Sequence, residues 1–166
     1  MDNIAIAIKD ALVAQGIPHQ LITILISMIP LLELRGSILV AGLLKLPLIQ
    51  TYISAVIGNM IPVPFILLFI QAIFNCMKKI KYISSIPLKL EKKVMAKSDQ
   101  IQKYGYWGLF LFVAIPLPGT GAWTGSLLAV LLGLNRKKSL LVILLGVMTA
   151  GLIMTLVSYG VIGIFI

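Results

Sequence analysis

Two charged residues, Glu33 and Arg35, lie in the middle of an apolar stretch that covers residues 20–44. An ionisable side chain in such a stretch is costly unless it faces protein or a cavity, so the two residues indicate a binding site. A carboxyl group in low-dielectric surroundings can bind and release a proton or hold a cation. The guanidinium of Arg35 stays charged, and its planar fork matches a phosphate or a carboxylate. The alternative is a neutralising structural pair with no role in binding.

A second chemical motif is the helix-breaking run Pro116–Gly121, which interrupts the apolar stretch 104–134. Its last three residues, Gly-Thr-Gly, could present free N–H groups at the start of a half-helix, where the helix dipole favours an anion. The alternative is a simple break that lets two backbones pack closely. Trp123 follows the run and either lines a cavity or anchors the chain at the membrane interface.

Asn59 lies midway along the apolar stretch 46–77 and is followed by two prolines. That stretch is too long for one straight span, so a kink is expected near the prolines. Asn59 either lines the cavity or satisfies carbonyl groups that the prolines free. The predicted binding residues are Glu33, Arg35, Asn59, Pro118, Gly119, Thr120, Gly121 and Trp123. The predicted helix breaks are at Pro30, Gly36, Pro62, Pro64 and Pro116.

The composition is that of an integral membrane protein. Of the 166 residues, 60% are hydrophobic and 11% are charged, whereas soluble domains are about half apolar and a quarter charged. This excludes a soluble enzyme, a disordered tail and a disulfide-rich secreted scaffold. Each apolar stretch is longer than the roughly 20 residues that cross a bilayer, which predicts a single all-α membrane domain over residues 1–166. The stretches are 20–44, 46–77, 104–134 and 139–166.

Metal, cofactor and enzyme chemistry have no candidate residues in the sequence. The chain has one histidine, His19, and one cysteine, Cys76, which are too few and too far apart to hold a metal ion. No nucleophile is paired with a base. The formal net charge of +9 comes without a nucleic-acid-binding motif. We therefore expect no metal, no cofactor, no nucleic-acid partner and no enzymatic activity.

The basic residues predict how the chain crosses the membrane. Most lysines lie in segment 78–103, and a second basic cluster, at 136–138, follows the stretch 104–134; both should be cytoplasmic. If that stretch crossed once, the two clusters would lie on opposite faces, so we expect it to enter and return as a re-entrant helical hairpin. The interruption at 30–36 predicts a second re-entrant hairpin in the stretch 20–44.

Short matches between the two halves indicate an internal duplication. Ile-Pro-Leu at 29–31 recurs at 115–117, and Gly58 recurs as Gly146. Each half would hold one re-entrant hairpin and one kinked transmembrane helix, which makes the fold an inverted repeat like those of many secondary transporters. An amphipathic interfacial helix is expected at residues 2–15. The expected parts are repeat 1 at about 1–77, a basic amphipathic connector at 78–103 and repeat 2 at about 104–166.

The motifs Pro30-x-x-Glu33-Leu34-Arg35-Gly36 and Pro116-Leu117-Pro118-Gly119-Thr120-Gly121-Ala122-Trp123 also carry a resemblance. With them the sequence resembles the putative small multidrug export proteins, a prokaryotic family that is distantly similar to the DedA membrane proteins. The resemblance implies two facing re-entrant hairpins and a transport role. In DedA-like proteins that role is the translocation of lipid phosphates, coupled to an ion or proton gradient.

Three functions fit these features. The first is transport of an anionic lipid carrier of the polyprenyl phosphate type, coupled to an ion or proton gradient. The second is proton-coupled export of cationic drugs, in which Glu33 would hold proton and drug in turn. The third is a scaffold without transport activity, whose lysine-rich segment recruits anionic lipid or a partner protein. In each case the expected location is a prokaryotic cell membrane, with membrane lipids as partners, and a fold this small is compatible with a homodimer.

Overall fold

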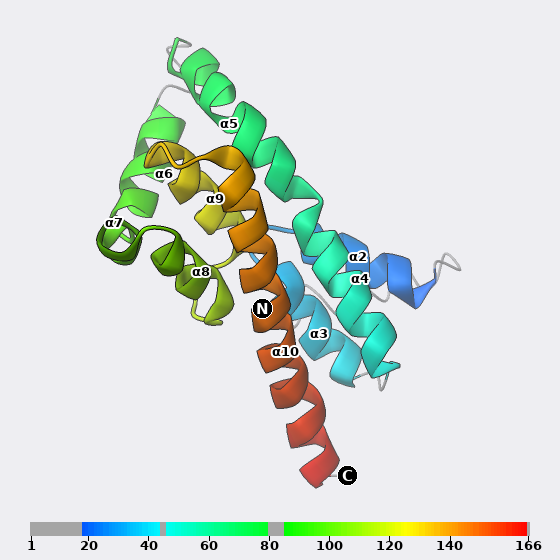
Figure 1. Cartoon of the computed structure of the whole chain (residues 1–166). Coiled ribbons are helices and arrows are strands. Elements are labelled where there is room, and N and C mark those ends of the chain that lie inside the picture. The colour runs from blue at the N-terminus through cyan, green and yellow to red at the C-terminus, as the bar shows by residue number, and fades with distance from the viewer. Residues whose placement is uncertain (1–17, 44–45, 80–84, 166) are drawn as a thin grey trace.

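The computed structural model describes residues 18–43, 46–79 and 85–165 of the chain. All the secondary structure in these ranges is helical (Figure 1). This agrees with the all-α fold expected from the sequence. The interfacial helix predicted at residues 2–15 lies outside the described residues.

Long apolar helices form the frame of the molecule. Helix α4 (Leu48–Met60) continues almost directly into α5 (Pro62–Lys78), and α10 (Arg136–Phe165) is a single helix of 30 residues. Among the described residues, Leu48–Lys78 and Arg136–Gly160 are long and apolar enough to cross a membrane. At about 1.5 Å per residue each exceeds the bilayer core of about 30 Å, which is consistent with a membrane location.

Of the two prolines predicted to interrupt the first long helix, only Pro62 marks a junction, because α4 ends at Met60 and α5 begins at Pro62. The prediction that Pro64 breaks a helix is wrong. Pro64 lies in the first turn of α5, where a backbone N–H has no acceptor within the helix, so a proline there removes no hydrogen bond.

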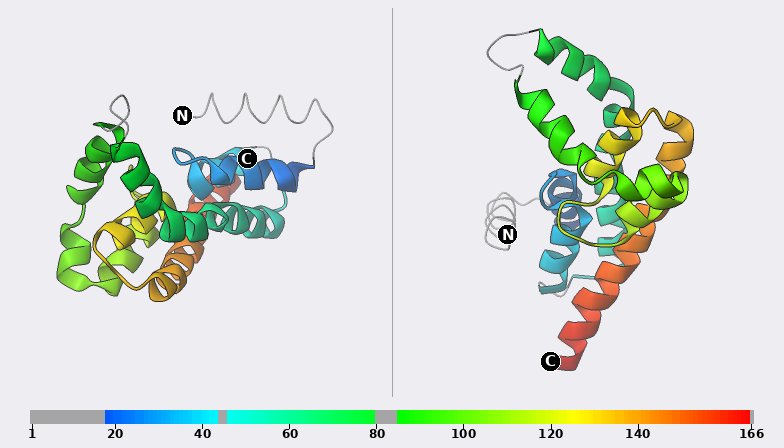
Figure 2. Two further views of the ribbon diagram at one scale, coloured as in Figure 1. Left: turned by 90° about the horizontal axis from the view of Figure 1, so that it is seen from above. Right: turned by 90° about the vertical axis from the view of Figure 1, so that its left-hand side faces the viewer.

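Two pairs of short helices lie beside the long ones (Figures 1 and 2). The first pair is α2 (His19–Met28) and α3 (Glu33–Leu43), separated by a break at 29–32. The second pair is α8 (Tyr106–Ala114) and α9 (Ala122–Leu131), separated by a break at 115–121. None of these helices exceeds 11 residues, a length of about 17 Å that reaches only about half-way across a bilayer core.

Gly36 does not break a helix, contrary to the prediction. It lies inside α3, and its N–H donates to the carbonyl oxygen of Leu32 at 2.9 Å. The break comes earlier, at Pro30, and ends at Glu33, whose backbone has a φ of +50°. A left-handed conformation is unfavourable for a residue with a side chain, so it persists only where surrounding contacts hold it.

The lysine-rich connector contains two helices, α6 (Ser85–Met95) and α7 (Asp99–Tyr104). Figure 2 shows α6 folding back beside α5, and α6 also contacts α9. An ion pair between Lys78 and Glu91, with a distance of 2.8 Å, joins the end of α5 to α6. The connector is therefore packed against both long-helix and short-helix elements.

Two glycines allow the long helices to approach the short ones closely. Gly58 in α4 lies against Ile24 and Ser27 of α2, and a Cβ atom at position 58 would come within 2.9 Å of Ser27 Cβ. Gly146 in α10 lies against α8, where a Cβ atom would come within 2.8 Å of Val113 Cβ. Across the halves, α3 packs on α10 and α9 packs on α5. Each short pair thus touches both long helices.

We expect Gly58→Ala and Gly146→Ala each to destabilise the protein by about 1–3 kcal/mol, because the added methyl group has no room. Gly160→Ala, in α10, is the matched control: a methyl group there would meet no atom of the described residues within 4 Å, so stability should be unchanged or slightly higher. Thermal unfolding of the purified variants in detergent measures the difference. Equal melting temperatures for all three variants would contradict the close packing.

Candidate functional site

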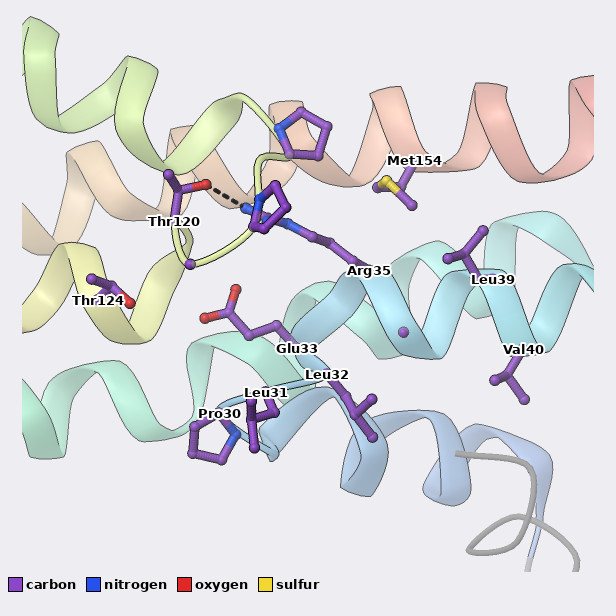
Figure 3. A pocket seen from close by; sticks show the side chains of 14 residues that line it. Pro30, Leu31, Leu32, Glu33, Arg35, Leu39, Val40, Thr120, Thr124 and Met154 are labelled. Atoms are coloured by element: carbon purple, nitrogen blue, oxygen red, sulfur yellow. Dashed lines mark hydrogen bonds between the residues drawn. The ribbon is translucent and has the colours of Figure 1, made fainter. Parts of the chain in front are cut away.

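A cavity of about 460 Å³ lies where the two helix breaks meet (Figure 3). One end is polar, with Glu33, Arg35, Thr120 and Thr124, whereas Leu39, Val40 and Met154 lie at the other end. The remaining walls come from the two breaks and from α3: Pro30, Leu31, Leu32, Gly36, Pro116, Pro118 and Gly119. The cavity is therefore amphipathic, with its charged groups gathered at one end.

Arg35 reaches from α3 to the carbonyl oxygens that follow α8. Its Nη1 donates to the carbonyl oxygen of Leu117, and its Nη2 donates to Thr120 Oγ1 at 2.9 Å and lies 3.5 Å from the carbonyl oxygen of Ile115. These carbonyls lie beyond the end of α8 at Ala114, and they also accept hydrogen bonds from the N–H groups of Leu117 and Thr120 within the break. The guanidinium thus adds a charged donor at the C-terminal, electronegative end of a half-helix.

Glu33 reaches from the start of α3 to the opposite side of the same break. Its Oε1 accepts a hydrogen bond from the backbone N–H of Trp123 at 3.2 Å, in the first turn of α9. Gly121 makes room for the carboxylate, since a Cβ atom at that position would overlap it. Glu33 is only 4% exposed, and its second oxygen, Oε2, has no hydrogen-bond partner among the described residues. The carboxylate therefore occupies the electropositive N-terminus of α9.

Glu33 and Arg35 do not form an ion pair with each other. Each instead bonds to groups of the second break, the carboxylate at the start of α9 and the guanidinium beyond the end of α8. The only described ion pair in residues 18–43, 46–79 and 85–165 joins Lys78 to Glu91. The expectation of a simple neutralising pair does not describe this geometry, because the two charges stabilise two different helix ends.

Asn59 is fully buried at the end of α4, beside the Glu33 carboxyl group but without a hydrogen bond at normal distance. Within the described part of the chain, neither atom of its amide has a partner. The indole Nε1 of Trp123 is buried and unbonded there in the same way. Buried polar groups of this kind are costly, so they mark a place where a proton, a water molecule or a ligand can be accommodated.

The structure brings most of the predicted binding residues together. Glu33, Arg35, Pro118, Gly119 and Thr120 line the cavity itself. Gly121 and Trp123 lie directly behind Glu33 at the start of α9, and Asn59 lies on its α4 side. Among the described residues, no group of three or more His, Cys, Asp or Glu side chains could hold a metal ion.

Lys97 also contacts the second break, although the sequence did not predict it as a site residue. Its Nζ donates to the carbonyl oxygen of Gly119 at 2.9 Å and lies 3.5 Å from that of Pro118. Gly119 has a φ of +76°, and a side chain there would overlap the lysine. The break at 115–121 is thus held by two cations, Arg35 from α3 and Lys97 from the connector. In a segment with many lysines, nothing in the sequence distinguishes this one.

The family model described as putative small multi-drug export protein matches residues 33–153, which includes every residue of the cavity except Pro30, Leu31, Leu32 and Met154. No curated protein and no solved structure matches the chain. The matched region begins at Glu33 and extends through both charged residues, the whole second break and most of α10.

Thr120 is expected to hold Arg35 in place. Thr120→Val removes the hydroxyl that links Arg35 Nη2 to the carbonyl oxygens of Ile115 and Leu117, and it should lower the free energy of unfolding by about 1–2 kcal/mol. Thr124→Val is the matched control, because Thr124 lines the same cavity and makes no hydrogen bond to Arg35. Chemical unfolding in detergent gives both values. If the two variants are equally stable, the Thr120 hydroxyl does not stabilise the contact between Arg35 and the break.

Proposed function

The chain belongs to the small multi-drug export protein family, and from that premise and its cavity we propose that it transports an anionic amphiphile across a membrane. The proposed substrate class is a lipid phosphate of the polyprenyl phosphate type, and the transport is coupled to a proton or ion gradient. The family description names an export protein, which is a transporter and not an enzyme. The choice of an anion rests on Arg35.

Arg35 carries the proposal because its charge is not neutralised by a contacting carboxylate. Its described partners are two carbonyl oxygens and one hydroxyl, all of them neutral. The nearest acid, Glu33, is engaged with the α9 N-terminus instead. A guanidinium held in this way leaves positive potential at the polar end of the cavity, and its planar fork suits a phosphate.

The shape of the cavity supports an amphiphile. Its volume of about 460 Å³ falls in the range of roughly 300–1,000 Å³ that is usual for sites of small organic ligands. Leucine, valine and methionine side chains at the end away from Glu33 provide an apolar wall for a hydrocarbon chain (Figure 3). Leu31 is 82% exposed and borders the cavity, so a tail could continue past it into lipid. A headgroup and the first part of a tail fit this space.

We further propose that the two short-helix pairs are re-entrant hairpins related by an inverted repeat. The lengths of α2, α3, α8 and α9, half of what a bilayer core needs, support this topology. The glycine contacts support the repeat. Gly58 contacts Ile24 and Ser27, and Gly146 contacts Phe110 and Val113. Both contacted residues of the second half lie 86 positions after those of the first half, and the two glycines lie 88 positions apart. The same contact therefore occurs at equivalent positions of the two halves.

A second candidate function is proton-coupled export of cationic drugs, in line with the multi-drug export that the family description names. One observation favours it: the buried Oε2 atom of Glu33 has no partner among the described residues, and a carboxylate of this kind could hold a cation. Arg35 lines the same cavity and would repel such a ligand. We therefore favour the anion.

The proposed topology places residues 85–100 and 135–138 on the same, cytoplasmic side of a prokaryotic cell membrane. We expect single cysteines at Lys93 and Lys137, both exposed, to react with a membrane-impermeant maleimide from the cytoplasmic side in a Cys76→Ser background. A cysteine at Ile49, 70% exposed at the start of α4, is the control and should react from the outside. If positions 93 and 137 react from opposite sides, residues 104–134 cross the membrane once and do not form a hairpin.

Substitution of Arg35 separates the two substrate classes. Arg35→Lys should weaken binding of a polyprenyl phosphate because an ammonium lacks the bidentate fork, and Arg35→Ala should weaken it further. A lipophilic cation should bind Arg35→Ala as well as wild type or better, and Glu33→Gln should abolish its binding. Ligand-induced thermal stabilisation, run with both ligands, measures these effects.

Stabilisation by the cation alone, lost in Glu33→Gln and kept in Arg35→Ala, would overturn the anion proposal in favour of drug export. Stabilisation by neither ligand would favour the scaffold function, for which the exposed lysines of α6 are the relevant feature. The two charged residues would then be needed for the fold alone.

A further inference from the structure

Within the cavity, one anion already occupies the place where an anionic headgroup would bind best. The N-terminus of α9, a helix of ten residues, has its N–H groups directed at the break, and the carboxylate of Glu33 lies against them. Such a position favours any anion over a neutral group. The substrate headgroup and the Glu33 carboxylate are therefore competitors for the same donors.

A second observation concerns the free side of that carboxylate. In the described part of the chain, Glu33 Oε2 is buried without a partner, and beside it Asn59 is 0% exposed with neither its oxygen nor its nitrogen bonded. An amide can serve both forms of a carboxyl group, because its N–H donates to the carboxylate and its oxygen accepts from the acid. The Asn59 amide beside Glu33 can thus form a hydrogen bond with the protonated carboxyl group as well as with the carboxylate.

We infer that Glu33 is the resident anion of the site and that the substrate replaces it only when Glu33 takes up a proton, so that proton and anionic substrate travel together in the same direction. The inference rests on the proposed function and adds the sign of the coupling. A proton from the aqueous side bonds to Oε2, which then donates to Asn59 Oδ1. The neutral acid leaves the α9 N-terminus, and a headgroup anion takes its place beside Arg35.

The charges of the site balance in this exchange. Before it, Glu33 is −1 and Arg35 is +1; after it, Glu33 is neutral and a monoanionic headgroup supplies the −1. Binding without the proton would place the headgroup beside the charged Glu33 carboxylate at the same N–H groups of α9, and two like charges this close repel each other even with Arg35 and Lys97 nearby. A cationic substrate would instead compete with the proton for Glu33, so its coupling would have the opposite sign.

Few other groups near Glu33 can titrate or carry charge. Arg35 lies on the same helix, α3, and Lys97 contacts the break at Gly119, a residue that lines the cavity. The neighbouring residues of α9, α4 and α10 at the site are Ala122, Trp123, Asn59 and Met154, and none of them is ionisable. In the described part of the site, Glu33 is thus the acid that can take up a proton when the substrate binds.

The test uses two probes with the same tail and a charge that does not change with pH. Farnesyl methyl phosphate, a phosphodiester, is a fixed monoanion, and farnesyl trimethylammonium is a fixed cation. Their dissociation constants for the purified full chain are measured between pH 5.5 and 8.5, together with the number of protons taken up on binding. Variants are Glu33→Gln and, as a matched control, Glu91→Gln on the connector helix α6.

We expect the wild type and Glu91→Gln to bind the anion up to tenfold more weakly for each pH unit above the titration of Glu33, with uptake approaching one proton per bound anion. Glu33→Gln should bind it with the same affinity at every pH and take up no proton. If Glu33→Gln does not fold, proton uptake by the wild type still shows whether a proton binds together with the anion.

Two results would overturn the inference and remain distinguishable. Anion binding that does not depend on pH in the wild type, without proton uptake, would refute the exchange and leave the proposed function intact. No anion binding at any pH, with cation binding that weakens on acidification, would refute the exchange and the proposed function together.

Discussion

The structure depends on how two charged side chains of α3 bind backbone groups beside the ends of two other helices. A helix leaves its first N–H groups and its last C=O groups without internal partners, and a bilayer core offers no water to replace them. At the second break, Glu33 accepts from an N–H group at the start of α9, and Arg35 donates to carbonyl oxygens of the segment that follows α8. Because both side chains come from the first turn of α3, the position of α3 fixes the geometry of the second break and of the cavity.

The same constraint explains the unusual backbone of Glu33. Its φ of +50° is unfavourable for a residue with a side chain. In this conformation the carboxylate reaches the N-terminus of α9, while Arg35, two residues later, reaches the carbonyl oxygen of Leu117. Contacts of both side chains with the second break hold this conformation. The strained backbone of Glu33 is therefore part of the candidate site, because it lies in the same turn of α3 that carries Glu33 and Arg35.

Much of this arrangement could be predicted from sequence. Prolines and glycines locate both breaks, and isolated charges in apolar stretches locate the site. The exact ends of the breaks could not be predicted, because Gly36 and Pro64 occupy helical positions where their usual effects do not apply. Nor could the partners of Glu33 and Arg35, since these are mostly backbone atoms and lie 80 or more positions away along the chain. The contact of Lys97 could not be predicted either, because it depends on the place where α6 ends.

The distance along the chain between these partners has a consequence for how the protein is made. Arg35 bonds to a residue 82 positions later and Glu33 to one 90 positions later. While the ribosome is still adding the connector, the first short-helix pair therefore carries a carboxylate and a guanidinium whose donor and acceptor have not been synthesised. In the proposed topology this pair lies in the membrane, where such charges are costly until the second break has been synthesised. With that topology, the first pair reaches its final set of contacts only after the second break has been synthesised, so the two halves complete the site together.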